Sequence, residues 1–233
     1  MYTLCFAFLF SQSLDLYEFS IMQQPSFFKY VLRTDVILIG KHKDDVKQFN
    51  GVVLSSHKSH IDFFLGFAFG DAASLGRMLV AAACPFMWLC GWLSSTFIVF
   101  NRSKSKRSKP LRERFTDAIS KRGRLLIYPE GHRLPIRGTL SPFRTGILSY
   151  CFHNRVPVFL APAEGAQVVL NYATGAIRRG YPIVINCCNV LYPDQYQDLE
   201  DFIADAQEQF IAGYEDATAE FDSIVSKNSQ RRI

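Results

Sequence analysis

The sequence predicts an α/β protein: a single domain with a central, mostly parallel β-sheet flanked by helices, preceded by an N-terminal amphipathic segment. Short apolar runs of strand length recur along the 233-residue chain, and stretches of helical length and pattern lie between them. Strands that alternate with helices in this way indicate an α/β domain. The chain is 48% hydrophobic and 20% charged, which is sufficient for one substantial core.

The apolar runs that predict strands are 36–40, 51–55, 78–82, 96–100, 124–128, 156–160 and 183–185. The predicted helices are 85–93, 111–121 and 198–226, the last with apolar residues at helical spacing on an acidic background. The run from Met78 to Asn101 contains no charged residue and has the length of a membrane span. Because Pro85 and Gly91 interrupt it, we interpret it as buried strands and a short helix, with a span as the alternative.

Residues 1–35 are expected to contact a membrane, and residues 36–233 to form the main domain. Tyr2–Phe10 is apolar but only nine residues long, which is too short to cross a bilayer. With the Leu, Tyr and Phe residues that follow it, this run can form a helix lying in the plane of the interface. A helix packed on the core is the alternative.

Charge is distributed unevenly along the chain. The segment from Arg102 to Arg124 contains ten Lys or Arg residues and only two acids, whereas the segment from Asp194 to Asp222 contains ten acids and no Lys or Arg. The basic block suits phosphate, a nucleotide-bearing cosubstrate or an anionic membrane surface, and a solvated helix face is the alternative. No nucleic-acid partner is expected. The six cysteines lie mostly inside apolar runs, as free thiols do, which favours a reducing, cytosol-facing environment.

The stretch from Ser56 to Asp62 joins an apolar run to an aromatic one, so we expect a turn and then a helix, with Ser59 as its N-cap. Residues five apart diverge within a helix, so His57 and Asp62 can meet only if His57 precedes it. Asp62 would then bind one ring nitrogen, and the other could take a proton from a substrate. A capping carboxylate and a loop histidine are the alternatives. No further ligand cluster lies nearby, so no metal site is expected.

A second motif, Tyr128–Arg133, lies at the end of a predicted strand. Pro129 blocks ladder pairing and Gly131 permits a tight turn, so Glu130 and Arg133 are expected at a strand tip. The guanidinium of Arg133 is a planar fork suited to phosphate, and Glu130 could hold that fork or bind a hydroxyl. An ordinary turn with a surface ion pair is the alternative.

Four blocks, taken in order, resemble those of the glycerolipid acyltransferase family, whose members include 1-acylglycerol-3-phosphate acyltransferases. The blocks are His57–Asp62, Gly91–Arg102, Tyr128–Arg133 and Val156–Pro162. The combination is specific, although each block alone is not. The chain also lacks the Gly-x-Ser-x-Gly motif of α/β-hydrolases.

The resemblance implies transfer of an acyl chain from acyl-CoA to the hydroxyl of a lysophospholipid, 1-acylglycerol-3-phosphate, giving phosphatidic acid. Acyl-CoA is a cosubstrate, and no cofactor is expected. The family assigns His57 as general base, oriented by Asp62. It assigns to the phosphate-bearing acceptor Arg102, Glu130, Gly131 and Arg133. It also implies membrane association facing the cytosol, at the endoplasmic reticulum in a eukaryote or the inner membrane in a bacterium.

Two departures from the family pattern concern the acceptor head group. His132 stands where Thr is usual, and the block from Val156 has one residue more between Pro157 and Pro162. Two alternative functions follow from the same motifs. One is a CoA-independent transacylase that remodels phospholipids, and the other is a non-catalytic lipid-binding protein of the same fold.

Overall fold

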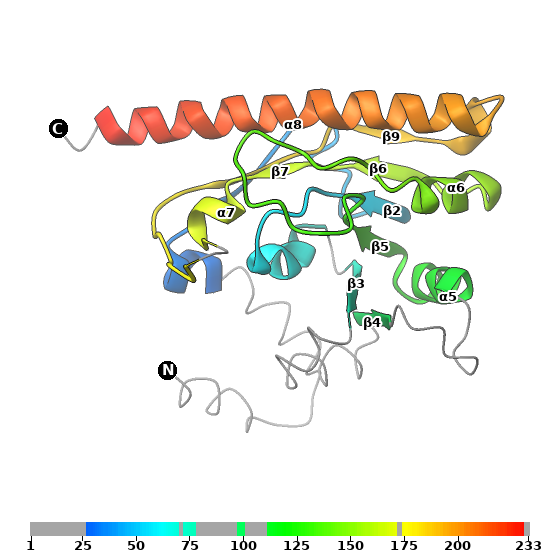
Figure 1. Cartoon of the computed structure of the whole chain (residues 1–233), viewed down its shortest axis with the longest axis horizontal. Coiled ribbons are helices and arrows are strands. Elements are labelled where there is room, and N and C mark those ends of the chain that lie inside the picture. Colours follow the sequence, from blue (N-terminus) through cyan, green and yellow to red (C-terminus); the bar gives the residue numbers. More distant parts are fainter. Residues whose placement is uncertain (1–26, 70–71, 78–96, 101–110, 172–173, 231–233) are drawn as a thin grey trace, which may run out of the picture.

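The computed structural model of the chain describes residues 27–69, 72–77, 97–100, 111–171 and 174–230 (Figure 1). Most of the predicted N-terminal segment, the predicted strand 78–82 and the predicted helix 85–93 lie outside these residues. None of the described helices combines the length and the apolar composition that crossing a bilayer requires.

The described part of the chain contains two β-sheets. The larger has six strands in the order β4-β3-β5-β2-β6-β9, and the smaller has the order β1-β8-β7. The strands are β1 Val36–Ile39, β2 Gly51–Leu54, β3 Ala73–Arg77, β4 Phe97–Phe100, β5 Arg124–Ile127, β6 Val158–Leu160, β7 Ala163–Glu164, β8 Ile183–Asn186 and β9 Asn189–Leu191. Neighbouring strands are parallel except for the β6–β9 and β7–β8 pairs. The predicted α/β class with a mostly parallel sheet is therefore confirmed.

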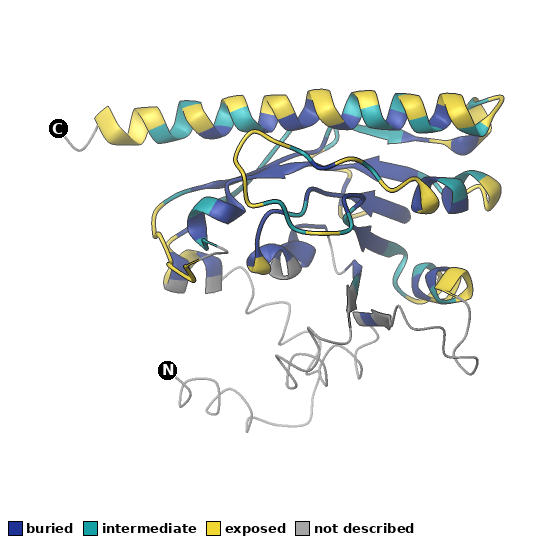
Figure 2. Ribbon diagram, in the orientation of Figure 1, coloured by how far each residue is buried: buried dark blue, intermediate teal, exposed yellow. Residues whose placement is uncertain are grey.

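The helices surround these sheets (Figure 1). They are η1 Phe27–Leu32, η2 His60–Phe69, α5 Leu111–Arg122, α6 Gly146–His153, α7 Ala166–Val169, η3 Pro193–Gln195 and α8 Leu199–Gln230. The long helix α8 runs along one side of the molecule beside β6, β7 and β9. Its inner face is buried and its outer face is exposed (Figure 2), as the spacing of its apolar residues predicts.

The central strands of the larger sheet, β2, β5 and β6, are covered on both faces. Side chains of alternate residues point to opposite faces, and they belong to two different hydrophobic clusters. Val53, Leu126 and Phe159 belong to one hydrophobic cluster, and the neighbouring Val52 and Leu125 belong to the other. All of these side chains have no exposed surface. Strands buried on both faces read as continuous apolar runs, which is why the sequence identifies them.

The described elements that the sequence did not predict are β3, β7, β9, α6, α7 and η3. Strand β3 reads Ala-Ser-Leu-Gly-Arg, which has neither a run of apolar residues nor a simple alternation. Strands β7 and β9 have two and three residues, too few to show a period. Tertiary pairing forms these strands, and their local sequence does not.

Candidate active site

The candidate site lies where β2 and β5 end. These two strands are parallel neighbours, and Leu54 pairs with Ile127 at their carboxyl ends. Three residues further along each strand, the chain reaches His57 and Glu130. The two residues meet, because the backbone N–H of His57 donates to Oε1 of Glu130 at 2.8 Å. Parallel pairing thus joins two motifs that are 73 residues apart in sequence.

His57 and Asp62 form the hydrogen-bonded pair that their spacing predicts. Nδ1 of His57 lies 2.9 Å from Oδ2 of Asp62. The same oxygen accepts the backbone N–H groups of Lys58 at 2.7 Å and Ser59 at 2.8 Å. The Asp62 side chain is 1% exposed, so these donors replace the water that an ionised carboxylate would otherwise bind.

The helix after this turn differs from the prediction in two ways. It is a 3₁₀ helix that begins at His60, and Ser59 does not cap it through its side chain. The hydroxyl of Ser59 instead donates to the carbonyl of Leu170 at 2.9 Å, which anchors the turn to a distant segment. The carboxylate of Asp62 takes the capping role by reaching back to the amides of the turn.

Tyr128 supports both members of the pair, although the sequence analysis gave it no role. Its ring stacks on the imidazole of His57, with centroids 4.3 Å apart and planes 13° apart. Its hydroxyl donates to the backbone carbonyl of Asp62 at 2.8 Å. Burial, and then the negative charge of Asp62, raises the pKa of Tyr128 well above its usual value, so the phenol remains a donor.

Glu130 is fully buried and binds the backbone on two sides. Oε1 accepts the N–H of His57, and Oε2 accepts the N–H of Ser141 at 3.0 Å. The carbonyl of His57 in turn accepts the N–H of Leu134 at 3.0 Å. The loop between β5 and α6 therefore holds the backbone of His57 through both of its polar groups. Contact between Glu130 and a substrate stays a prediction.

Gly131 and Arg133 lie on the same loop. Gly131 has φ of +68°, and a Cβ atom on it would lie 2.5 Å from Nε of Arg144, so this turn requires glycine. Arg133 is half-buried near His60. Burial, and then the guanidinium of Arg133, lowers the pKa of His60. Arg102, the remaining predicted contact to the acceptor, lies outside the described residues.

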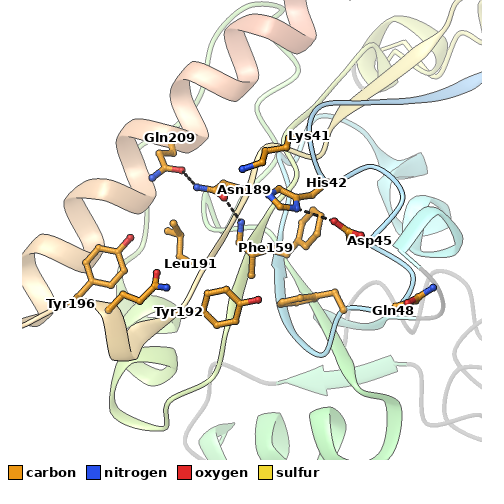
Figure 3. A pocket seen from close by; sticks show the side chains of 13 residues that line it. Lys41, His42, Asp45, Gln48, Phe159, Asn189, Leu191, Tyr192, Tyr196 and Gln209 are labelled. Carbon is orange, nitrogen blue, oxygen red and sulfur yellow. Dashed lines mark hydrogen bonds and ion pairs between the residues drawn. The ribbon is translucent and has the colours of Figure 1, made fainter.

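A pocket of about 540 Å³ lies apart from the predicted residues, beside the edge strand β9 (Figure 3). None of the predicted site residues lines it. Several of its polar side chains bind one another: Nδ1 of His42 lies 3.0 Å from Asp45, and Asn189 donates to Gln209 at 2.8 Å. Within the described ranges, no group of three or more His, Cys, Asp or Glu side chains is placed to hold a metal ion.

A family model described as Acyltransferase matches residues 38–162, which is more than half of the chain. The chain belongs to the acyltransferase family. The matched residues include the His57–Asp62 pair and the whole Tyr128–Arg133 motif. The membership of an acyltransferase family that these motifs indicated is thereby confirmed.

A solved structure agrees with this assignment at the level of the fold. The acyltransferase is similar to the crystal structure of the 1-acyl-sn-glycerophosphate (LPA) acyltransferase PlsC from Thermotoga maritima, with a TM-score of 0.68. The two sequences are 18% identical, and the match covers 92% of this chain and 86% of that one. A comparison with curated proteins finds no match.

Replacing Glu130 with Gln should destabilise the protein, because the amide can accept at only one of the two backbone N–H groups. We expect the free energy of unfolding to fall by about 1–3 kcal/mol, the range for a buried donor left unsatisfied. Urea denaturation measures this change. Glu215→Gln, on the exposed face of α8, is the matched control and should change stability by less than about 0.5 kcal/mol. Equal stabilities of the two variants would contradict the bridging role of Glu130.

Proposed function

We propose that this acyltransferase moves an acyl chain from acyl-CoA to the hydroxyl of 1-acylglycerol-3-phosphate, releasing phosphatidic acid and CoA. The observation that carries the proposal is the His57–Asp62 pair, held by hydrogen bonds just after the carboxyl end of the central strand β2. The chain that carries this pair belongs to the acyltransferase family. The name of the structural neighbour, a 1-acyl-sn-glycerophosphate acyltransferase, supports this choice of acceptor.

The pair supports general-base catalysis in one displacement. Nδ1 of His57 faces Asp62, so proton transfer falls to Nε2. As Nε2 removes the proton of the acceptor hydroxyl, the oxygen bonds to the thioester carbonyl carbon. The C–S bond then breaks, and the imidazolium returns the proton to the leaving thiolate of CoA. Asp62 keeps the ring in the required tautomer and stabilises the imidazolium.

The described cysteines do not offer an alternative nucleophile. Burial raises the pKa of Cys187 and of Cys188 to about 12, and it also raises the pKa of Cys151. A thiol must lose its proton to attack a thioester, and these thiols keep theirs at neutral pH. Direct attack by the acceptor hydroxyl needs no acyl-enzyme, because a thiolate already leaves readily.

Arg133, together with Arg102, is proposed to bind the phosphate of the acceptor. The loop that carries Arg133 also carries Glu130, which holds the backbone of His57. A phosphate bound on this loop would therefore bring the neighbouring hydroxyl of the glycerol toward His57. A guanidinium can bind two phosphate oxygens at once, which fixes orientation as well as distance.

The acceptor is a lipid, so we also propose that the protein binds an anionic membrane surface on the cytosolic side. Residues 1–35 would insert apolar side chains, apart from Phe28 and Leu32, which are buried in the core. The basic block 102–124 would add electrostatic attraction. Within that block, α5 buries Phe115 and Ala118 and exposes Arg112 and Lys121. The exposed Arg112 and Lys121 are consistent with contact to head groups, although Glu113 and Asp117 of the same helix are exposed as well.

An assay with labelled acyl-CoA and a panel of lysophospholipids tests the reaction. We expect turnover with 1-acylglycerol-3-phosphate, and a loss of about 10²–10⁴-fold in kcat for His57→Ala and a comparable loss for Asp62→Asn. His153→Ala, at the exposed end of α6, is the control and should retain full activity. Turnover from a donor phospholipid alone would instead indicate a transacylase. Turnover only from an acyl chain bound to acyl carrier protein would replace acyl-CoA as the proposed donor. Lipid binding without turnover would indicate a non-catalytic protein.

Arg133→Ala should raise KM for the lysophospholipid more than KM for acyl-CoA, because the proposed contact is to the acceptor phosphate. Arg133→Lys should restore only part of the affinity, since an ammonium cannot form two parallel hydrogen bonds. Steady-state kinetics with each substrate varied in turn measures both terms. A rise in KM for acyl-CoA alone would instead indicate that Arg133 binds the acyl donor.

Membrane binding should depend on salt and on the N-terminal residues. We expect sedimentation with anionic vesicles to fall in high salt, since each Lys or Arg near the surface contributes about 1 kcal/mol. Removal of residues 1–24 should lower both sedimentation and activity on vesicle substrate more than activity on dispersed substrate. Full resistance to alkaline carbonate would contradict interfacial binding and favour a membrane span in residues 78–101.

A further inference from the structure

We infer that Lys58 is a positioning residue for the reaction: its buried ammonium offsets the carboxylates behind His57 and links the catalytic turn to helix α8. The inference rests on the proposed function, because it gives Lys58 a purpose in keeping His57 able to act as a base. Lys58 lies between His57 and Ser59, and nothing in its local sequence distinguishes it from an exposed loop lysine.

The environment of Lys58 is unusual for a lysine, since its side chain is among the largest fully buried ones at 1% exposure. Its Nζ donates to the backbone carbonyl of Thr139, on the loop between β5 and α6. The same atom lies 4.6 Å from the centre of the Tyr214 ring, on α8. A buried ammonium is stable only with such polar partners and with nearby negative charge.

Three buried carboxylates supply that negative charge: Asp62, Glu130 and Glu164, each at most 1% exposed. All three attract the ammonium and oppose the effect of burial, which lowers the pKa of Lys58. Asp62 binds the imidazole of His57, and Glu130 binds its backbone N–H. Lys58 therefore shares a low-dielectric region with both carboxylates that hold His57.

Glu164 extends this network to α8. Its Oε2 accepts the hydroxyl of Tyr214, and its Oε1 accepts the side-chain amide of Gln167. Burial, and then the charge of Glu164, raises the pKa of Tyr214, so its hydroxyl remains a donor. Arg137, which is 45% exposed, approaches Glu164 to 4.0 Å and also pairs with Asp222 of α8. Glu164 and Tyr214 both follow residue 162, where the family match ends.

The charges facing His57 decide how readily its imidazole takes a proton before the substrate arrives. Asp62 and Glu130, which bind His57, favour the imidazolium, whereas the nearby charge of Lys58 favours the neutral ring that can act as a base. Glu164 faces Lys58 and offsets its charge. Among the other described groups, Arg133, Arg137 and the ring of His60 are more exposed and better screened by solvent. Tyr128, which stacks on the imidazole, stays neutral because burial raises its pKa. Removing the charge of Lys58 should therefore shift His57 toward the protonated, inactive form.

Lys58→Met tests this effect, because methionine keeps much of the length and removes the charge. We expect the acid limb of the kcat/KM profile to move to higher pH by about one unit, the size of effect that a nearby charge produces. The NMR titration midpoint of the His57 imidazole should move in the same direction. Lys58→Arg, which keeps the charge, should leave both midpoints close to their wild-type values, and Lys43→Met, at an exposed position, should cause no shift.

Glu164→Gln provides a test with the opposite sign. It removes one negative charge and keeps the shape of the side chain, so both midpoints should move to lower pH. The double variant Lys58→Met/Glu164→Gln leaves neither charge unpaired and should return toward the wild-type midpoint. Comparing Glu164→Gln with the double variant tests the inference even if Lys58→Met alone does not fold.

The NMR titration does not depend on turnover, so it separates the two proposals. Absence of acyl transfer by the wild-type protein from any donor would overturn the proposed function. A His57 midpoint that is unchanged in folded Lys58→Met, or that moves in the same direction in Glu164→Gln, would overturn the role of Lys58. Opposite shifts in the two single variants, with Lys43→Met unchanged, would support it.

Discussion

The hydrogen bonds received by the carboxylate of Asp62 determine the shape of the site. One oxygen of this buried group binds the imidazole of His57 and the amides of Lys58 and Ser59. These contacts close the turn at the end of β2, and in the proposed mechanism they assign proton transfer to Nε2. A buried carboxylate is tolerated because several groups donate hydrogen bonds to it. Any change that removes these donors would leave the cost of its burial uncompensated and destabilise the folded protein.

A second buried carboxylate, Glu130, fixes this turn relative to the rest of the protein. Its two oxygens bind the backbone of His57 and of Ser141, and Tyr128 adds a ring that stacks on the imidazole. Catalytic rates depend on holding a base within a few tenths of an ångström of its working position. Backbone hydrogen bonds and stacking provide that rigidity, since neither depends on a flexible side chain.

The buried carboxylates of the site also need a compensating positive charge, because burying them without one is unfavourable. Three carboxylates are buried close to Lys58, and two of them, Asp62 and Glu130, bind His57 itself. Lys58 lies among them and contacts Tyr214 of α8, which is contributed by the last third of the chain. The site formed by the family motifs thus also includes residues that follow the segment matched by the family model, 38–162.

Local sequence determined much of the architecture. Apolar runs identified β1, β2, β4, β5, β6 and β8, and fully buried strands such as β2, β6 and β8 have little room for polar residues. Apolar spacing identified α8, and the five-residue separation of His57 and Asp62 indicated a pair formed across a turn. All of these signals involve residues close together in the chain.

Only the tertiary structure decided how the two motifs fit together. The pairing of β2 with β5 turned Glu130 toward the amide of His57, whereas the sequence predicted only that it lies at a strand tip. The same folding buried Lys58 beside Glu164 and Tyr214, which follow it by more than a hundred residues. Hydrogen bonds and charges between such distant residues depend on strand order and register. Local composition carries no record of either, so the sequence alone could identify the His57–Asp62 pair, proposed to be catalytic, but not the groups that hold it.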